Sequence, residues 1–153
     1  MSQKPLFIGM FYSSVDADGG VEIPERYVEK LYNKKSRAYE TVIIFDQALK
    51  VYKPAGFKVY LRERRKQLEK MPEEKRERER KLLRVTASTM YSIECIEGRL
   101  QIPESVRQLA HLVPGKEAYV LGFADCFEIW DAEEFDIAFS RNLEEPFSET
   151  LSI

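Results

Sequence analysis

The feature that most constrains this chain is an internal repeat. The stretch GGVEIPE at residues 19–25 returns 79 residues later as GRLQIPE at residues 98–104. Upstream of it, the pair Tyr12-Ser13 returns at the same spacing as Tyr91-Ser92. A second block, residues 42–57, aligns with residues 120–135 at a spacing of 78. Two blocks that keep their order indicate two copies of one structural unit.

Both copies predict the same elements. Their Gly-X-aliphatic-X-Ile stretch alternates apolar and polar residues, which suits a half-buried strand. Pro24 and Pro103 end that strand and favour the first turn of a helix. Helical spacing follows, with Tyr27 and Leu31 on one side in the first copy and Val106 and Leu109 in the second. Two further strands are expected in each copy, over 41–46 and 48–53 and over 117–123 and 125–131, joined at Asp46-Gln47 and Ala124-Asp125. Each copy is therefore predicted to run strand, helix, strand, strand.

The segment between the copies, residues 55–86, is predicted to be helical and highly charged. A sparse apolar stripe supports helices over about 55–70 and 72–84, separated at Pro72, which cannot donate an interior backbone hydrogen bond. Residues 57–84 contain 12 Lys or Arg and 6 Asp or Glu, a net charge of +6. The acids are interleaved with the bases, so a solvated helix with ion pairs is one interpretation. An auxiliary phosphate contact, or a charge match to an acidic neighbouring subunit, is the other.

Chain length sets the domain organisation. A unit of about 45 residues cannot bury a good core alone, so the two copies are expected to pack around a shared core in an α+β fold. The predicted boundaries are 6–54 for the first copy, 55–86 for the linker, 87–140 for the second copy and 141–153 for an acidic tail. That tail is expected to be loose, or to dock only through Phe147.

No catalytic or metal-binding pattern is present in the sequence. His111 is the only histidine, which excludes a two-histidine metal site and makes most catalytic triads hard to build. The glycine-rich nucleotide motifs and the HExxH motif are absent. Asp16 and Asp18 lie beside Gly19-Gly20, where acidic residues are most simply explained by turn geometry. We therefore expect a protein that is not an enzyme, with no cofactor, metal or small-molecule substrate.

Cysteine use and hydropathy indicate the compartment. Cys95 and Cys126 are isolated, which predicts two reduced, partly buried thiols. No run of 18 apolar residues and no signal-peptide core occur, so we expect no membrane segment and a cytoplasmic location.

Large apolar residues gather in the second copy. They are Phe123, Phe127, Ile129, Trp130 and Phe135. Aromatic residues dominate buried area, so core packing is one interpretation of the group. A subunit interface is the alternative, because short repeats and edge strands favour association.

The motifs resemble those of the MraZ family. GRLQIPESVR followed by VLGFADCFEIWDAEEF is similar to the second half of MraZ chains, and DADGGVEIPERY followed by ALKVYKP is similar to the first half. The resemblance covers residues 7–140. It implies tandem SpoVT/AbrB-type domains whose strands interweave as two swapped-hairpin repeats in one pseudo-symmetric small barrel. It also implies ring-shaped oligomers that bind DNA.

The family's DNA-contacting loop has the form Asp-X-Lys-Gly-Arg before the Ile-Pro strand, and this chain keeps only part of it. The second copy keeps Gly98 and Arg99, but Cys95 replaces the Asp and Glu97 precedes the glycine. The resemblance makes Arg99 the principal base or phosphate contact, and Gly98 provides the tight turn. Arg107, in the Val-Arg that follows the second Ile-Pro, is the supporting contact.

The first copy departs further from the family loop. It keeps Asp16 and Gly19, but Asp18 replaces the Lys and Gly20 replaces the Arg. Removing a phosphate contact weakens DNA binding and flattens its salt dependence, although a ring compensates through linked contacts. We therefore expect weaker binding per site.

The expected function is that of a regulator. It would bind repeated promoter boxes in double-stranded DNA of the division and cell-wall gene cluster, as a ring-shaped homo-oligomer associated with the nucleoid. The alternative is an oligomeric scaffold or interaction protein of the same fold that has lost most DNA binding.

Overall fold

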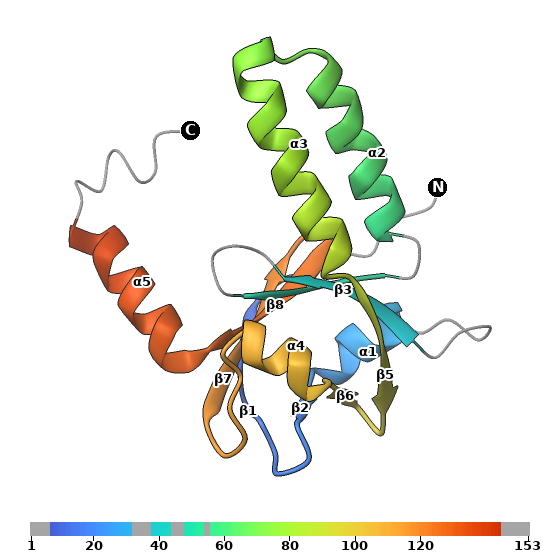
Figure 1. Ribbon diagram of the computed structural model, residues 1–153. Helices are drawn as coiled ribbons and strands as arrows, with labels where there is room; N and C mark the ends of the chain where they lie inside the picture. Colours follow the sequence, from blue (N-terminus) through green and yellow to red (C-terminus); the bar gives the residue numbers. More distant parts are fainter. Residues whose placement is uncertain (1–6, 32–37, 44–47, 54–55, 145–153) are drawn as a thin grey trace.

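A mixed α+β fold connects the two copies through one extended set of strands. The computed structural model describes residues 7–31, 38–43, 48–53 and 56–144, which contain eight strands and five helices (Figure 1). The strands are β1 Met10–Ser14, β2 Gly20–Glu22, β3 Ala38–Ile43, β4 Leu49–Tyr52, β5 Tyr91–Ile96, β6 Arg99–Gln101, β7 Glu117–Phe123 and β8 Cys126–Asp131. The helices are α1 Glu25–Leu31, α2 Gly56–Glu69, α3 Glu73–Ser88, α4 Glu104–Leu109 and α5 Ala132–Glu144. The predicted α+β class is confirmed.

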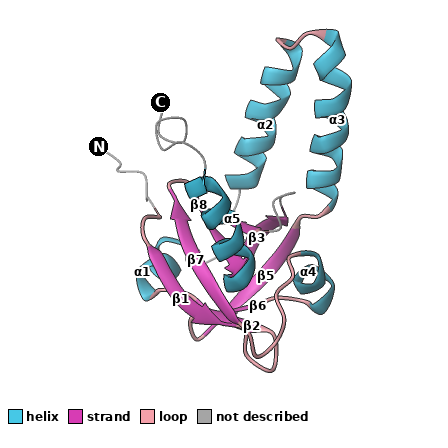
Figure 2. Ribbon diagram, turned by 90° about the vertical axis from the view of Figure 1, so that its left-hand side faces the viewer, coloured by secondary structure: helices cyan, strands magenta, loops and turns pink. Residues whose placement is uncertain are grey.

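All strand pairs are antiparallel, and many join one copy to the other. The strand order is β1-β7-β8-β4-β3-β5-β6-β2, and Figure 2 shows the strands in magenta below the α2–α3 hairpin. The first strand of each copy pairs with the third strand of the other, β1 with β7 and β5 with β3. The fourth strands β4 and β8 pair with each other, as do the second strands β2 and β6. A separate bridge pairs Val15, which directly follows β1, with Val21 in the middle of β2.

The main core lies among these interleaved strands and draws on both copies. Side chains that alternate along the strands supply this core. In β8, Phe127 and Ile129 are fully buried, while the residues between and after them are half-buried. Tyr27 of α1 is also buried, and its ring makes edge or tilted contacts with Phe7 and Phe127 at centroid distances of 5.1 and 5.2 Å. Val106 of α4 closes the same cluster. Neither copy's apolar residues form this core alone.

The structure contains two strands that the sequence pattern did not predict. β1 and β5 precede the Gly-X-aliphatic-X-Ile stretch, so each copy runs strand, strand, helix, strand, strand. Their exposed residues obscure the alternation, since β1 has three exposed residues in five and β5 four in six. The Ala124-Asp125 connector is the expected tight turn, with Ala124 at φ 60°. The Asp46-Gln47 connector lies outside the described residues.

The two short helices follow their prolines as predicted. Pro103 is the residue immediately before α4, and the carbonyl of Pro24 accepts the backbone N–H of Tyr27 at 2.8 Å in α1. The two apolar residues predicted to share one side of α4 differ in burial. Val106 is buried, but Leu109 is 53% exposed, because the chain turns after α4 and Ala110 and Leu112 take the inner positions.

The linker forms the predicted pair of helices. α2 and α3 are antiparallel neighbours that project from the strands, and Pro72 directly precedes α3 (Figure 1). Phe57 is the only buried residue of α2, and α3 has none among the residues described. Arg64 and Glu79 cross between the two helices with a nitrogen–oxygen distance of 2.7 Å. The hairpin is therefore anchored at its base and solvated along most of its length.

Helix α5 was not expected. It begins directly after β8 and extends to Glu144, so the boundary predicted between residues 140 and 141 falls within a helix. Asp131 caps it, because its carboxylate accepts the backbone N–H of Glu134 at 3.0 Å. Residues 145–153, including Phe147, lie outside the described part of the chain.

The predicted thiol state agrees with the structure. Both cysteines are reduced thiols; Cys126 is 3% exposed and Cys95 is half-buried. Burial raises the pKa of the Cys126 thiol to about 11, which keeps it protonated at neutral pH. Across the described residues, no helix has the length and apolar character needed to cross a membrane.

Candidate nucleic-acid interface

The loop of the second copy is a two-residue hairpin turn between β5 and β6. Glu97 and Gly98 occupy it with φ values of 51° and 79°. Positive φ at both central residues matches the twist of the flanking strands, and it is the conformation that glycine adopts without steric cost. A β carbon at Gly98 would meet no atom within 4 Å, so the backbone angle rather than space requires glycine here. This turn places Arg99 at the first position of β6.

The loop of the first copy is organised by one carboxylate. Asp16 Oδ1 accepts the backbone N–H groups of Asp18 at 3.0 Å and Gly20 at 2.7 Å. These bonds explain why an aspartate at the start of the turn is favourable, as predicted for this loop. The Gly20 N–H is the main cause of a lowered pKa for Asp16, with smaller contributions from the Asp18 N–H and from Arg99; burial opposes them. Asp16 is therefore ionised at neutral pH.

Arg99 connects the two loops. Its Nη1 lies 3.0 Å from Asp16 Oδ2, and the two side chains are 50% and 29% exposed. Strands β2 and β6 bring them together, since their antiparallel register places Glu22 opposite Arg99 and Gly20 opposite Gln101. A solvent-exposed pair of this kind contributes about 0.2–1 kcal/mol, so it orients Arg99 without fixing it permanently.

Arg107 covers the first loop from the other side. It belongs to α4, and its Nε donates to the carbonyl of Ile102 at 3.1 Å. A β carbon at Gly19 would overlap the guanidinium of Arg107, and Gly19 has φ 86°. Glycine at position 19 is thus required twice, for the backbone angle and for the approach of Arg107. The helix of the second copy rests on the loop of the first.

The four residues that the sequence singled out therefore gather at one end of the fold. Gly98 and Arg99 come from the second loop, Gly19 from the first, and Arg107 from α4. The loops are also joined through their backbones, because the N–H of Ile23 donates to the carbonyl of Gly98 at 3.0 Å. This end, which we call the two-loop end, lies opposite the α2–α3 hairpin (Figure 1).

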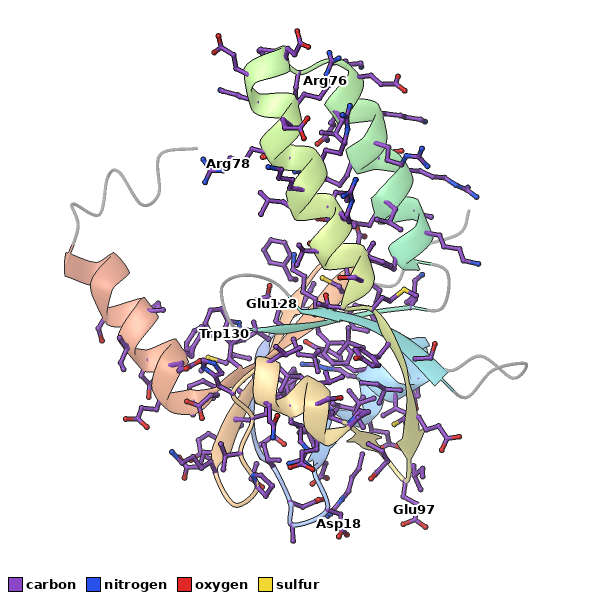
Figure 3. The ribbon with its side chains drawn as sticks, in the orientation of Figure 1. Asp18, Arg76, Arg78, Glu97, Glu128 and Trp130 are labelled. Atoms are coloured by element: carbon purple, nitrogen blue, oxygen red, sulfur yellow. The ribbon has the colours of Figure 1, made fainter. Side chains whose placement is uncertain are left out.

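Acidic residues occupy the tips of both loops. Asp18 and Glu97 lie at the extreme of the two-loop end, and their side chains point away from the body of the protein (Figure 3). Together with Asp16 they give three negative charges against the two arginines. A DNA phosphate approaching Arg99 would meet this local field and would have to displace Asp16 from Nη1.

The Asp16–Arg99 contact is the feature of the candidate interface that sequence reasoning missed. Asp16 and Arg99 are 83 positions apart, and only the β2–β6 pairing brings them together. One signal was available, because Gly20 leaves the space that Asp16 needs. A β carbon at position 20 would lie 2.7 Å from Asp16 Oδ2. With glycine at position 20 in place of the motif arginine, the Asp16 carboxylate lies in space that a β carbon would contest.

Within the described ranges, no three His, Cys, Asp or Glu residues are placed to hold a metal ion. His111 follows α4, and its Nδ1 lies 2.5 Å from Oε1 of Glu134 at the start of α5. That contact joins two elements of the second copy.

The chain has recognisable relatives over nearly its whole length. Residues 96–152 match a family model described as "MraZ protein, putative antitoxin-like". The chain is 30% identical over 131 residues to the transcriptional regulator MraZ of Alkaliphilus metalliredigens, covering 85% of this chain and 84% of the relative. It is 28% identical over 155 positions to the transcriptional regulator MraZ of Pectobacterium atrosepticum, covering 95% and 97% of the two chains. For the protein of that name in Maridesulfovibrio salexigens the identity is 25% over 140 residues, with coverage of 91% and 89%.

Proposed function

This chain belongs to the MraZ family, and we propose that it is a DNA-binding transcriptional regulator that contacts DNA through its two-loop end. The observation that carries the proposal is the placement of Arg99. It is half-exposed at the junction of both loops, and Arg107 lies on the neighbouring loop. A guanidinium with several free donors suits both phosphate oxygens and the edge of guanine.

The electrostatics predict a weak contact for each subunit. Three carboxylates share the two-loop end with two guanidinium groups, so counterion release on DNA binding is small. We infer that affinity comes from repetition: a ring-shaped homo-oligomer presents one Arg99 per subunit to repeated promoter boxes. Linked contacts then share a high effective concentration. Following the family, the proposed targets are promoters of the division and cell-wall gene cluster, and the proposed location is the nucleoid.

The same proposal includes a closed, pseudo-symmetric barrel of two swapped-hairpin repeats. Its support is the strand register. Val21 pairs with Leu100, its counterpart 79 residues later, and Lys50 pairs with Glu128, its counterpart 78 residues later. In its ladder, each of these central pairs has one neighbouring residue pair on either side. If each residue is replaced by its counterpart in the other copy, these two flanking pairs change places. A two-fold pseudo-axis would pass through the two central pairs, and the Val15–Val21 bridge would close the barrel.

This symmetry also affects the domain boundaries. We propose that residues 6–54 and 87–140 are two halves of one folding unit, joined by the linker 55–86. The second half then continues through α5, because Phe135 of that helix packs on Tyr119 and Trp130 of the strands.

A second candidate function follows from the acidic loops. A scaffold or interaction protein of the same fold would have no need for a basic surface at the two-loop end. Asp18 and Glu97 at the tips, with Asp16 already paired to Arg99, favour this alternative. The two functions differ in whether Arg99 meets DNA.

A fluorescence-anisotropy titration separates the two functions. The probe is a labelled duplex that carries direct repeats from upstream of the protein's own gene, at several salt concentrations. Arg99→Ala should weaken binding at least tenfold and reduce the slope of log K against log salt by about 0.9 for each phosphate that Arg99 neutralises. Arg78→Ala, on the exposed surface of α3, is the matched control and should bind like the wild type. Tight binding that Arg99→Ala leaves unchanged would remove Arg99 from the interface, and no binding by the wild type would favour the scaffold.

A further inference from the structure

The α2–α3 hairpin carries a basic groove far from the two-loop end. Five cationic side chains line it, contributed by both helices, and no acidic residue does. They are Lys58, Arg62, Arg65, Arg80 and Arg84. All five are exposed, so their charges are available to a partner. The interleaved acids of the linker therefore do not neutralise this face.

Few of these cations have a partner within the chain. Arg80 has one ion pair, a 3.7 Å contact with Glu77 in which both groups are exposed and which is therefore weak. For the other four, the described residues provide no ion pair. The stronger inter-helix pair, Arg64–Glu79, uses residues that do not line the groove.

The floor of the groove is apolar. Leu61 and Leu83 are half-buried there, and Ala87 continues the floor toward the base of the hairpin. A basic rim around an apolar floor has the chemistry to bind a helix that carries acids beside an apolar stripe. Simple phosphates would leave the leucines exposed.

Helix α5 of another copy of this chain would offer the complementary surface. Its 13 residues contain four acids and one arginine. Its exposed residues include Glu133 together with Ile137 and Phe139, which are 50% and 52% exposed. The helix is about 20 Å long, close to the length of the 14-residue α2.

The inner side of α5 is held firmly against the strands. Phe135 makes edge contacts with Tyr119 and Trp130 at centroid distances of 5.3 and 5.7 Å. The Tyr119 hydroxyl donates to Asp136 at 3.2 Å, and His111 contacts Glu134. The outer side is thus presented as a rigid surface, with little ordering left to lose on association.

Within one chain the two surfaces do not meet. Figure 1 shows α5 and the α2–α3 hairpin projecting from different sides of the strands. We propose that the exposed face of α5 of one subunit docks into the basic groove of the next. The contact joins two different surfaces, so each subunit presents its groove to one neighbour and its α5 to the other. Successive contacts of this kind form a closed ring if the rotation between neighbouring subunits allows closure. This inference deepens the proposed function, because it identifies the contact that would build the ring.

The test is a charge exchange followed by mixing. Arg62→Glu/Arg84→Glu reverses the charge of the groove, and Glu133→Arg reverses the charge on the exposed face of the helix. Light scattering after size exclusion should show each variant alone falling from the oligomer toward the 17.9 kDa of one chain. An equimolar mixture should recover larger assemblies, because the altered surfaces are complementary to each other. Ile137→Ser, which leaves the mounting of α5 intact, should also lower the mass.

Two controls make the result decisive. Lys75→Glu/Arg78→Glu changes the same charge on a part of α3 outside the groove and should leave the mass unchanged. Circular dichroism melts should show that every variant remains folded. Folded groove and helix variants that both keep the wild-type mass would overturn the proposal, as would a mixture that recovers nothing.

The alternative occupant of the groove is nucleic acid. A groove variant that keeps its mass but binds the duplex more weakly would identify the groove as a DNA surface and would overturn the subunit contact. The Arg99→Ala titration is independent of this outcome. Assembly through α5 without any DNA binding would refute the proposed regulator and leave the subunit contact standing.

Discussion

At the scale of single residues, one carboxylate decides how Arg99 can act. Asp16 holds two backbone N–H groups of its own loop through Oδ1, and it contacts Arg99 Nη1 through Oδ2. The sequence predicted the turn-forming role of Asp16, because that role is local. It could not predict the contact with Arg99, since the partner comes from another strand of another copy. The carboxylate positions Arg99 and, in the proposed DNA contact, would also compete with DNA for it.

Replacing Asp16 with asparagine should separate these two effects. The amide side chain keeps an oxygen for the loop N–H groups but has no charge for Arg99. Breaking an exposed pair costs about 0.2–1 kcal/mol, so Asp16→Asn should tighten DNA binding by up to about fivefold in the anisotropy titration. Weaker binding would mean that Asp16 chiefly positions Arg99 and that the charge competition is minor.

The same variant should change the acid stability of the protein. Because the pKa of Asp16 is lowered in the folded state, its stabilisation is present above the unfolded pKa near 4 and is lost as the pH falls through the folded value. Urea titrations at neutral and acidic pH should therefore show a smaller acid loss for Asp16→Asn than for the wild type.

At the scale of elements, the sequence predicted strands from their alternation and the linker helices from a sparse apolar stripe and a proline. The strands 117–123 and 125–131 and both linker helices follow from alternation and from Pro72. β1 and β5 escaped because most of their residues are exposed. Helix α5 was not predicted, because its acidic and aromatic residues directly follow a predicted strand and resemble a continuation of it. Its cap gave no signal either, since Asp131 contacts Glu134 only once the helix has formed.

The antiparallel pairing of the segment around Phe7 with the end of β7 gives a stability prediction at this scale. Phe7 exchanges two backbone hydrogen bonds with Ala124, and a β carbon at Gly122 would overlap the backbone of Phe7 and Ile8. Backbone cannot rotate away, so Gly122→Ala should lower the free energy of unfolding by about 1–3 kcal/mol in urea titrations.

Gly56→Ala is the matched control for this substitution. The atoms nearest to a β carbon there would belong to the Tyr52 and Lys53 side chains, at 3.5 Å or more, which is ordinary contact. Its stability should equal or exceed that of the wild type. Equal stability for Gly122→Ala would show that the segment around Phe7 does not pack tightly on β7.

At the scale of the whole molecule, the two proposed interaction surfaces lie at opposite ends. The two-loop end holds Arg99 and Arg107 with three carboxylates, and the hairpin end holds five clustered cations. Sequence reasoning found the basic block and left its role open between ion pairs, phosphate and an acidic neighbour. The sequence alone could not decide between these roles. The same basic residues can be spread around two helices or can line one groove, and the packing of α2 on α3 determines which occurs.

The central claim is that DNA meets the two-loop end rather than the more basic hairpin, and a matched gain of charge tests it most directly. Asp18→Lys/Glu97→Lys adds four charges at the loop tips, and Glu73→Lys/Glu74→Lys adds the same four at the first turn of α3. In anisotropy titrations over a salt series, the loop variant should bind the promoter duplex at least tenfold more tightly than the wild type, with a steeper salt slope. The hairpin variant should gain far less. Equal gains for the two variants, or a larger gain for the hairpin variant, would contradict the claim.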